Sequence, residues 1–160
     1  MGKDWKNRAI TETIAKNVCS EYRGLMERCD SIEEIFDLYK RGVDWSLEND
    51  APSLSLLREY KDECEKNGIF MDRHFDGEVL DSQQTYIFHN CSGTIKTGLN
   101  IEKRIIPMLY FANGCDMTVE ASGNFCMKTR VPLYIYGDNK IMAEQSGDIE
   151  CILYKRVKKC

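Results

Sequence analysis

The chain has 160 residues and a formal net charge of −4. This length suffices for one domain or a small pair of domains with a hydrophobic core. The sequence has no run of about 18 apolar residues, which a membrane-spanning helix would need. The acidic balance does not favour nucleic acid, so we expect a partner that is neither nucleic acid nor membrane.

The N-terminal part of the chain has the periodicity of amphipathic helices. Apolar or aromatic side chains recur at every fourth position from residue 10 to residue 26, which predicts one helix over residues 7–26. Trp5 precedes it among basic residues. A frayed end is the favoured interpretation of this segment, with a nucleic-acid contact as the alternative.

Two further helices are expected before residue 68. Ser31 and Glu34 have the spacing of a capping box, and Gly42 is a typical helix stop. Residues 43–50 predict a short helical link in which Trp45 packs against the preceding helices. Asp50 then caps a third helix, which ends near residue 67. Residues 73–84 are polar and weakly patterned, which indicates a linker or loop.

The second half of the chain repeats itself, and its last two units match at offsets of 24 to 25 residues, as in Ile106 with Val131 and Glu120 with Glu144. Segments 86–91, 109–114 and 133–138 each begin with apolar, β-favouring residues and end in a turn. Turns such as Asn113-Gly114 and Ser122-Gly123 predict corners that need positive φ. A constant offset of this size is typical of stacked repeats.

The predicted fold class is therefore α+β. A three-helix N-terminal unit, residues 1–72, precedes a repetitive β domain, residues 73–160. We expect the latter to form a short β-solenoid-like repeat of about three coils from residue 84. An antiparallel β-meander or sandwich is the alternative, because the sequence of a strand–turn–strand unit is the same whether neighbouring strands pair parallel or antiparallel.

No catalytic residue, metal site or cofactor is predicted. The eight cysteines include no C-x-x-C pair, and a polar N-terminus without the apolar core of a signal peptide favours the cytosol, so they are interpreted as buried structural thiols. Two minor alternatives remain. His89 and Cys91 would point to the same face of a strand, and Asp44 and Glu48 would share a helix face near Asn49 and Asp50.

Binding residues are expected in the β domain. Tyr134 and Tyr136 alternate with apolar residues and would be exposed on the outer face. The C-terminal residues 155–159, which we call the basic tail, would either shield the last strand edge or contact an acidic partner. Its candidate residues are Lys155, Arg156, Lys158 and Lys159. Two open ends of the repeat also predict a homo-oligomer that forms through the β domain.

Several segments together resemble an uncharacterised family encoded in phages, prophages and mobile elements of gut Bacteroidales. They are residues 22–26, 38–45, 48–53 and 67–69, with the capping box at Ser31. The resemblance implies a helical N-terminal region followed by a repetitive β region, although this chain has Asn-Gly and Ser-Gly turns where the family has Asp-Asn-Ala. It implies no activity.

The resulting functional prediction is a non-enzymatic protein-binding or assembly module. By the resemblance, it would be an accessory protein in the cytoplasm of a bacterial host that binds a host or defence component, or a minor part of a phage particle. The alternative is a small-ligand or metal-binding protein or an enzyme. It would use either the His89/Cys91 region or the segment with Asp44, Glu48, Asn49 and Asp50, which we call the acidic link.

Overall fold

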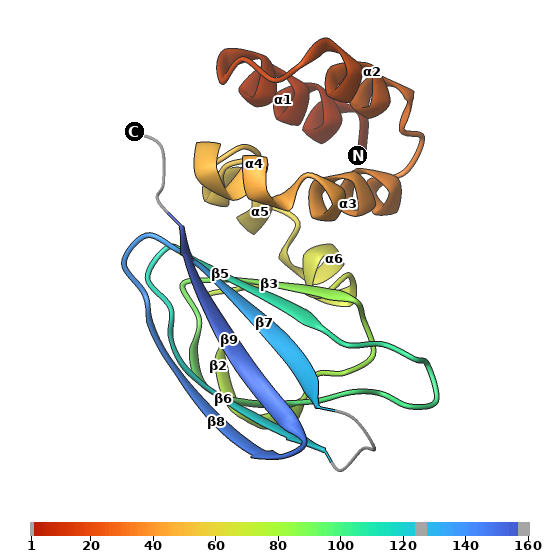
Figure 1. Cartoon of the computed structure of the whole chain (residues 1–160). Helices are drawn as coiled ribbons and strands as arrows, with labels where there is room; N and C mark the ends of the chain where they lie inside the picture. Colours follow the sequence, from red (N-terminus) through yellow and green to blue (C-terminus); the bar gives the residue numbers. More distant parts are fainter. Residues whose placement is uncertain (1, 124–127, 157–160) are drawn as a thin grey trace. The chain divides into compact units, whose positions relative to one another are not determined.

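A computed structural model describes residues 2–123 and 128–156, with side chains from residue 4 onward. The chain divides into two compact units between Asn67 and Gly68, a few residues before the boundary expected at 72/73. The first unit is helical and the second consists of β-strands (Figure 1).

The helical unit contains six short helices among the described residues, where three were predicted. They are α1 (Gly2–Ala15), α2 (Ser20–Arg28), α3 (Ile32–Arg41), α4 (Val43–Asn49), α5 (Leu54–Arg58) and α6 (Lys61–Lys66). The predicted helix over residues 7–26 is thus wrong, because it is divided into α1 and α2.

The break between α1 and α2 occurs at Asn17. This residue has φ 61°, and the amides of Asn17 and Val18 donate to the carbonyls of Ile14 (3.0 Å) and Thr13 (3.1 Å). That pair of bonds defines a Schellman motif, with asparagine in the left-handed position that glycine usually occupies. The apolar periodicity of the sequence continues through the break and therefore conceals it.

The predicted Ser31 cap of α3 is confirmed, but Glu34 bonds the amide of Asp30 in place of that of Ser31. Ser31 Oγ accepts a hydrogen bond from the Glu34 amide at 3.2 Å, while Glu34 accepts one from the Asp30 amide at 2.7 Å. Gly42 also ends α3, but its φ of −105° needs no glycine. The reason is space, because a Cβ at Gly42 would lie 2.8 Å from the Tyr22 ring.

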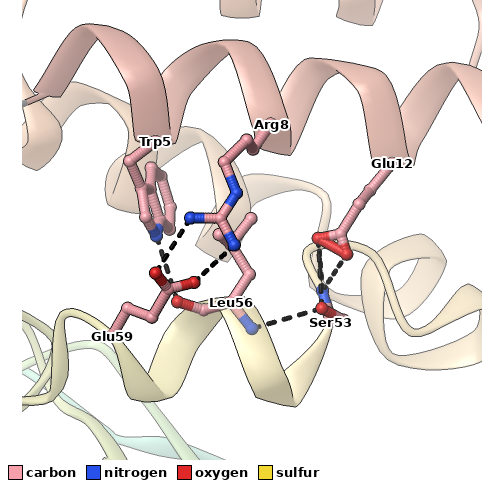
Figure 2. Close-up of polar contacts among 6 residues, drawn as sticks. All are labelled: Trp5, Arg8, Glu12, Ser53, Leu56 and Glu59. Atoms are coloured by element: carbon pink, nitrogen blue, oxygen red, sulfur yellow. Dashed lines mark hydrogen bonds and ion pairs between the residues drawn. The ribbon is translucent and has the colours of Figure 1, made fainter.

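Trp5 is part of the helical core and does not lie in a frayed end. Its side chain is 1% exposed and packs edge-on against Phe36 and Tyr60, with centroid distances of 5.6 and 5.4 Å. Figure 2 shows its indole Nε1 donating to the Leu56 carbonyl at 3.1 Å. Both sequence-based interpretations of Trp5 are therefore wrong.

Polar contacts continue this attachment of α1 to α5 and the residues beside it (Figure 2). Arg8 donates two hydrogen bonds to the Glu59 carboxylate at 2.8 and 2.6 Å. The Glu12 carboxylate accepts from the amide and hydroxyl of Ser53. Ser53 is the N-cap of α5, so Glu12 secures the residue that starts that helix.

In the second unit, the described residues form nine strands in two sheets. The strands are β1 (Ile69–Met71), β2 (His74–Val79), β3 (Thr85–His89), β4 (Ser92–Thr97), β5 (Met108–Ala112), β6 (Asp116–Gly123), β7 (Thr129–Tyr136), β8 (Lys140–Gly147) and β9 (Ile149–Arg156). One sheet has the order β1-β3-β5-β7-β9 and the other β2-β4-β6-β8.

The predicted fold class is wrong in its architecture. In the described part of the chain, six helices precede two parallel sheets of five and four strands that begin at Ile69, in place of three helices and a short β-solenoid-like repeat from residue 84. The antiparallel meander or sandwich is also wrong, because the named strands within each sheet pair in parallel.

Residues 73–84 are not a linker, since they contain β2. Its sequence, HFDGEV, is mostly polar and only Phe75 is fully buried, at 1% exposure. A strand with one buried side chain has no alternating apolar pattern for sequence analysis to detect.

The core of the β unit lies between the two sheets, and its side chains are stacked in register. Phe70, Phe88 and Phe111 come from β1, β3 and β5, with centroid distances of 5.6 and 5.1 Å and nearly parallel rings. Parallel pairing places Phe70 beside Phe88 and Phe88 beside Phe111. Val119, Leu133 and Ile149 belong to the same cluster.

We predict that Trp5→Ala destabilises the helical unit by roughly 3–5 kcal/mol, since it removes a fully buried ring and the Leu56 bond. Urea denaturation measures the loss. Trp45→Ala is the matched control and should cost less, because Trp45 is only partly buried. An unchanged urea midpoint for Trp5→Ala would mean that the N-terminus is frayed after all.

The backbones of β2 and β4 lie close together at Gly93. Gly93 has φ +95°, and a Cβ there would lie 2.0 Å from the Phe75 carbonyl oxygen. Gly77 has a similar φ of +89°, but the nearest atom to its Cβ is Lys96 Cε at 3.7 Å. Gly77→Ala should therefore cost about 1–2 kcal/mol for the left-handed backbone alone.

Gly93→Ala should cost clearly more than Gly77→Ala, because it adds a clash with the backbone of β2. Chemical denaturation of the two variants tests the difference. Equal losses would contradict the close approach of the two strands.

Candidate binding surface

Three tyrosines form a stacked row, which we call the tyrosine ladder. Tyr110, Tyr134 and Tyr154 occupy matching positions on β5, β7 and β9. Their ring centroids are 4.7 and 5.0 Å apart, with interplanar angles of 13° and 17°. Because side chains alternate along a strand and the neighbouring leucines Leu109 and Leu133 belong to the core, the ladder lies on the opposite face of this sheet.

Exposure increases along the tyrosine ladder. Tyr110 is 5% exposed, Tyr134 is partly buried and Tyr154 is 38% exposed. Stacking covers the flat faces of the inner rings. Tyr154 has a stacking neighbour on one side, since β9 is the last described strand of its sheet.

The structure places the other predicted binding residues in different environments. Tyr136 is fully buried and stacks on Tyr110 at 6.4 Å, so the expectation of an exposed aromatic is wrong there. Alternation predicts the face of a side chain but not its depth. Lys155 and Arg156 are exposed, whereas Lys158 and Lys159 lie outside the described residues.

Arg156 joins the tyrosine ladder at its exposed end. Its guanidinium carbon lies 5.8 Å from the ring centroids of both Tyr134 and Tyr154. This distance allows a cation–π interaction with each ring. An aromatic surface with a positive charge therefore lies at one edge of the sheet.

The two sheets both end in edge strands, β8 and β9, which are consecutive in sequence. We call these two strands together the open edge. It exposes apolar side chains: Met142 is 64% and Leu153 41% exposed. Among the described residues, each of these strands has a paired neighbour within its sheet on one side only. Unpaired edges of this kind are templates for another strand.

The corners that follow the strands of the larger sheet confirm the predicted use of left-handed residues. Asp72, Asn90, Asn113 and Gly137 have φ 54°, 51°, 60° and 76° and follow β1, β3, β5 and β7. Side chains tie neighbouring corners together: Asn90 Nδ2 donates to Asp72 Oδ1 at 2.8 Å. Asn139 Oδ1 accepts from the Cys115 amide at 2.7 Å.

The structure does not bring the side chains of His89 and Cys91 together. Cys91 belongs to the core between the sheets, where its Sγ contacts the His89 carbonyl oxygen at 3.4 Å and its amide donates to Cys115 Sγ. The imidazole of His89 instead lies 2.8 Å from the Asn113 amide nitrogen. The left-handed corner at Asn90 interrupts the strand alternation on which the dyad hypothesis depended.

The Cys91 thiol is poorly suited to be a nucleophile. Its hydrogen bond with Cys115 and its burial raise the pKa of Cys91 well above the ordinary value of a thiol. The side chains of Cys64 and Cys115 are buried as well, as expected for structural cysteines, while Cys19 is exposed. A reactive thiol needs a lowered pKa and access to solvent.

The carboxylates of the acidic link have helical positions in the structure. Asp44 and Glu48 lie on α4, and Asp50 is the left-handed C-cap of that helix rather than the cap of the next one. In residues 2–123 and 128–156, no cluster of three or more potential metal-ligating side chains is found. Ser53, with its hydroxyl accepting from the Leu56 amide, caps α5 instead.

One polar constellation was not predicted from the sequence. His74 Nε2 lies 3.1 Å from Asp76 Oδ1, and His74 Nδ1 lies 2.9 Å from Ser92 Oγ. The residue types are those of a serine–histidine–aspartate triad, but the two ring nitrogens are exchanged, because a catalytic triad places serine at Nε2 and aspartate at Nδ1. The His74 and Asp76 side chains are 64% and 88% exposed, however, whereas a catalytic triad buries its aspartate. We interpret it as a solvated surface network.

Only the pairing of β2 with β4 places His74 beside Ser92. Because β2 has no strand pattern in the sequence, this neighbourhood had no detectable signal.

Comparisons with protein-family models, with curated proteins and with solved structures found no match to this chain. No helix in the described part of the chain is both long and apolar enough to cross a membrane. The geometry of the surface is therefore the basis for proposing a function.

A thiol-labelling experiment tests the assignment of Cys91. At pH 7 to 8 the native protein should react with a thiol reagent at Cys19, whereas Cys91 should react only after denaturation, because its raised pKa and burial keep the thiol protonated and covered. Mass spectrometry of peptides locates the label. If Cys91 reacts as fast as Cys19 in the native protein, a nucleophilic role with His89 regains support.

Proposed function

We propose that this chain is a non-enzymatic protein-binding module. The observation that carries the proposal is the tyrosine ladder, which ends at the exposed Tyr154 beside Arg156. The candidate contact residues are Tyr134, Tyr154, Lys155 and Arg156. Tyrosine and arginine are enriched in the parts of interfaces that contribute most to affinity.

The chemistry of this surface favours an acidic protein partner. Stacking covers the ring faces of Tyr134, so that tyrosine presents its ring edge and hydroxyl group to a partner, and Tyr154 adds one open ring face at the end of the row. Lys155 and Arg156 add two exposed positive charges at the same end of β9. Carboxylates of a partner would complement these charges and accept hydrogen bonds from the tyrosine hydroxyls.

The biological setting of the proposal comes from the family resemblance. The chain resembles proteins encoded in phages and mobile elements, which supports an accessory protein in the cytoplasm of a bacterial host that binds a host or defence component. A minor part of a phage particle is the second possibility. Mass spectrometry of purified particles separates the two, because only a particle part would be recovered with them.

An enzyme or a small-ligand protein has less support. The acidic link lacks a third ligand among the described residues. Cys91 Sγ contacts the backbone carbonyl of His89, whereas the imidazole of His89 contacts Asn113. A thermal-shift screen with divalent metals and nucleotides tests this class. A ligand at 100 times its dissociation constant would stabilise the fold by about 2.7 kcal/mol.

Charge reversal tests the proposed contact surface. The protein is used as bait in lysate from its host, as the wild type and as the variant Arg156→Glu. Arg130→Glu is the matched control, since Arg130 is 74% exposed and lies on the same face of the neighbouring strand β7, toward its other end.

We expect a specific partner to be recovered with the wild type and with Arg130→Glu, and to be at least tenfold depleted with Arg156→Glu, because loss of an interface hot spot costs about 2 kcal/mol. The recovered partner should have an acidic surface. Equal recovery with all three baits would contradict the proposal.

A further inference from the structure

The open edge has a self-complementary pattern. β8 and β9 are both eight residues long and are joined through Asp148. Met142 lies six residues before Asp148, and Tyr154 lies six residues after it. Counted from the turn, these two exposed residues therefore occupy equivalent positions on the two sheets.

We propose that a second copy of the chain pairs with the open edge about a two-fold axis. β9 would pair antiparallel with β9 of the second copy, and β8 with β8. One axis perpendicular to both sheets would pass near Met142 and Tyr154, because both lie at the same distance from the turn. A two-fold arrangement closes both edges at once and leaves neither strand free for further addition.

Charges on β8 support this arrangement. Lys140 and Glu144 are exposed and lie two residues before and two residues after Met142 on the same face. With Met142 on the axis, Lys140 of each copy is directly opposite Glu144 of the other. Opposite charges in directly paired positions stabilise antiparallel strands, and like charges destabilise them.

The same pattern specifies the register. A shift that placed Glu144 on the axis would bring the two Glu144 carboxylates together, and each Lys140 would be opposite Asp148, which lies beyond the end of β8. A shift by one residue would turn the apolar face of one strand against the polar face of the other. Among these registers, the one centred on Met142 satisfies both the charges and the alternation.

The tyrosine ladder and the core gain from the same pairing. With Tyr154 on the axis, its open ring face would meet Tyr154 of the second copy, and the two ladders would become one continuous row. On the core side, Ile141 would be opposite Ala143 of the other copy. Both residues pack against the edge of the core and are only partly buried within one chain.

Formation of the dimer deepens the proposed function, because it doubles the tyrosine surface, although its evidence is the open edge rather than the partner-binding residues. The two proposals fail separately. In the dimer Arg156 would lie opposite Ile152 of the second copy, so Arg156→Glu places no like charges in that pair and leaves the Lys140–Glu144 contact unchanged. Lys140→Glu changes the dimer contact on the other sheet and leaves Arg156 unchanged.

Light scattering over a tenfold dilution series tests the dimer. The wild type should have twice the chain mass of 18.5 kDa at the highest concentration. Lys140→Glu should weaken dimerisation roughly tenfold, since it creates two symmetric like-charge pairs. The double reversal Lys140→Glu/Glu144→Lys should restore it. A monomeric wild type, or a double variant as weak as Lys140→Glu, would overturn the inference.

Cross-linking tests the register independently. Met142→Cys should form an intermolecular disulfide with diamide as the oxidant, because a residue on the axis lies next to its own copy. Ser146→Cys is the matched control on the same face of β8, and it lies too far from its copy. Peptide mass spectrometry identifies the linked residues. Equally efficient linkage of Cys at 146 would overturn the register.

Discussion

Parallel pairing in register is the constraint on which the β unit depends. It places equivalent residues of successive strands side by side. Phe70, Phe88 and Phe111 therefore stack in the core between the two sheets. Tyr110, Tyr134 and Tyr154 stack on the opposite face of the larger sheet. This register requires that the chain leaves each strand of the larger sheet at an equivalent position. Asp72, Asn90, Asn113 and Gly137 provide these turns with positive φ, which few other residues adopt at low cost.

The repeat in the sequence contains much of this register. The offset of 24 between Leu109 and Leu133 is the pairing of β5 with β7. The predicted left-handed corner at Asn113-Gly114 is confirmed, whereas Gly123 is the last residue of β6 and is not among the residues with positive φ. Features without a periodic signal could not be predicted. The Schellman motif at Asn17 divides a helix whose apolar period continues, and β2 has only one fully buried side chain. The sequence pattern also does not show whether two strands pair parallel or antiparallel, because contacts between residues far apart in the sequence determine the pairing.

Burial explains most differences at the candidate site. The alternation of Tyr134 and Tyr136 with apolar residues predicts a shared face, but Tyr136 is covered and Tyr134 is not fully covered. Trp5 shows the converse, since its basic neighbours suggest solvent while its ring lies in a core with Phe36 and Tyr60. Three of the predicted binding residues are neighbours in the structure. The Arg156 guanidinium lies over the Tyr134 ring, and Lys155 precedes Arg156 on β9, which pairs with β7. The function we propose follows from their position beside two unpaired strands.

The central claim is that the open edge of β8 and β9 is a surface for association rather than a passive end of the fold. Amide hydrogen exchange at two protein concentrations tests it most directly. Peptides covering residues 140–156 should exchange more slowly at the higher concentration, because pairing with a second copy protects edge amides, whereas residues 85–89 should be equally protected at both concentrations. Exchange of residues 140–156 that does not depend on concentration would contradict the claim.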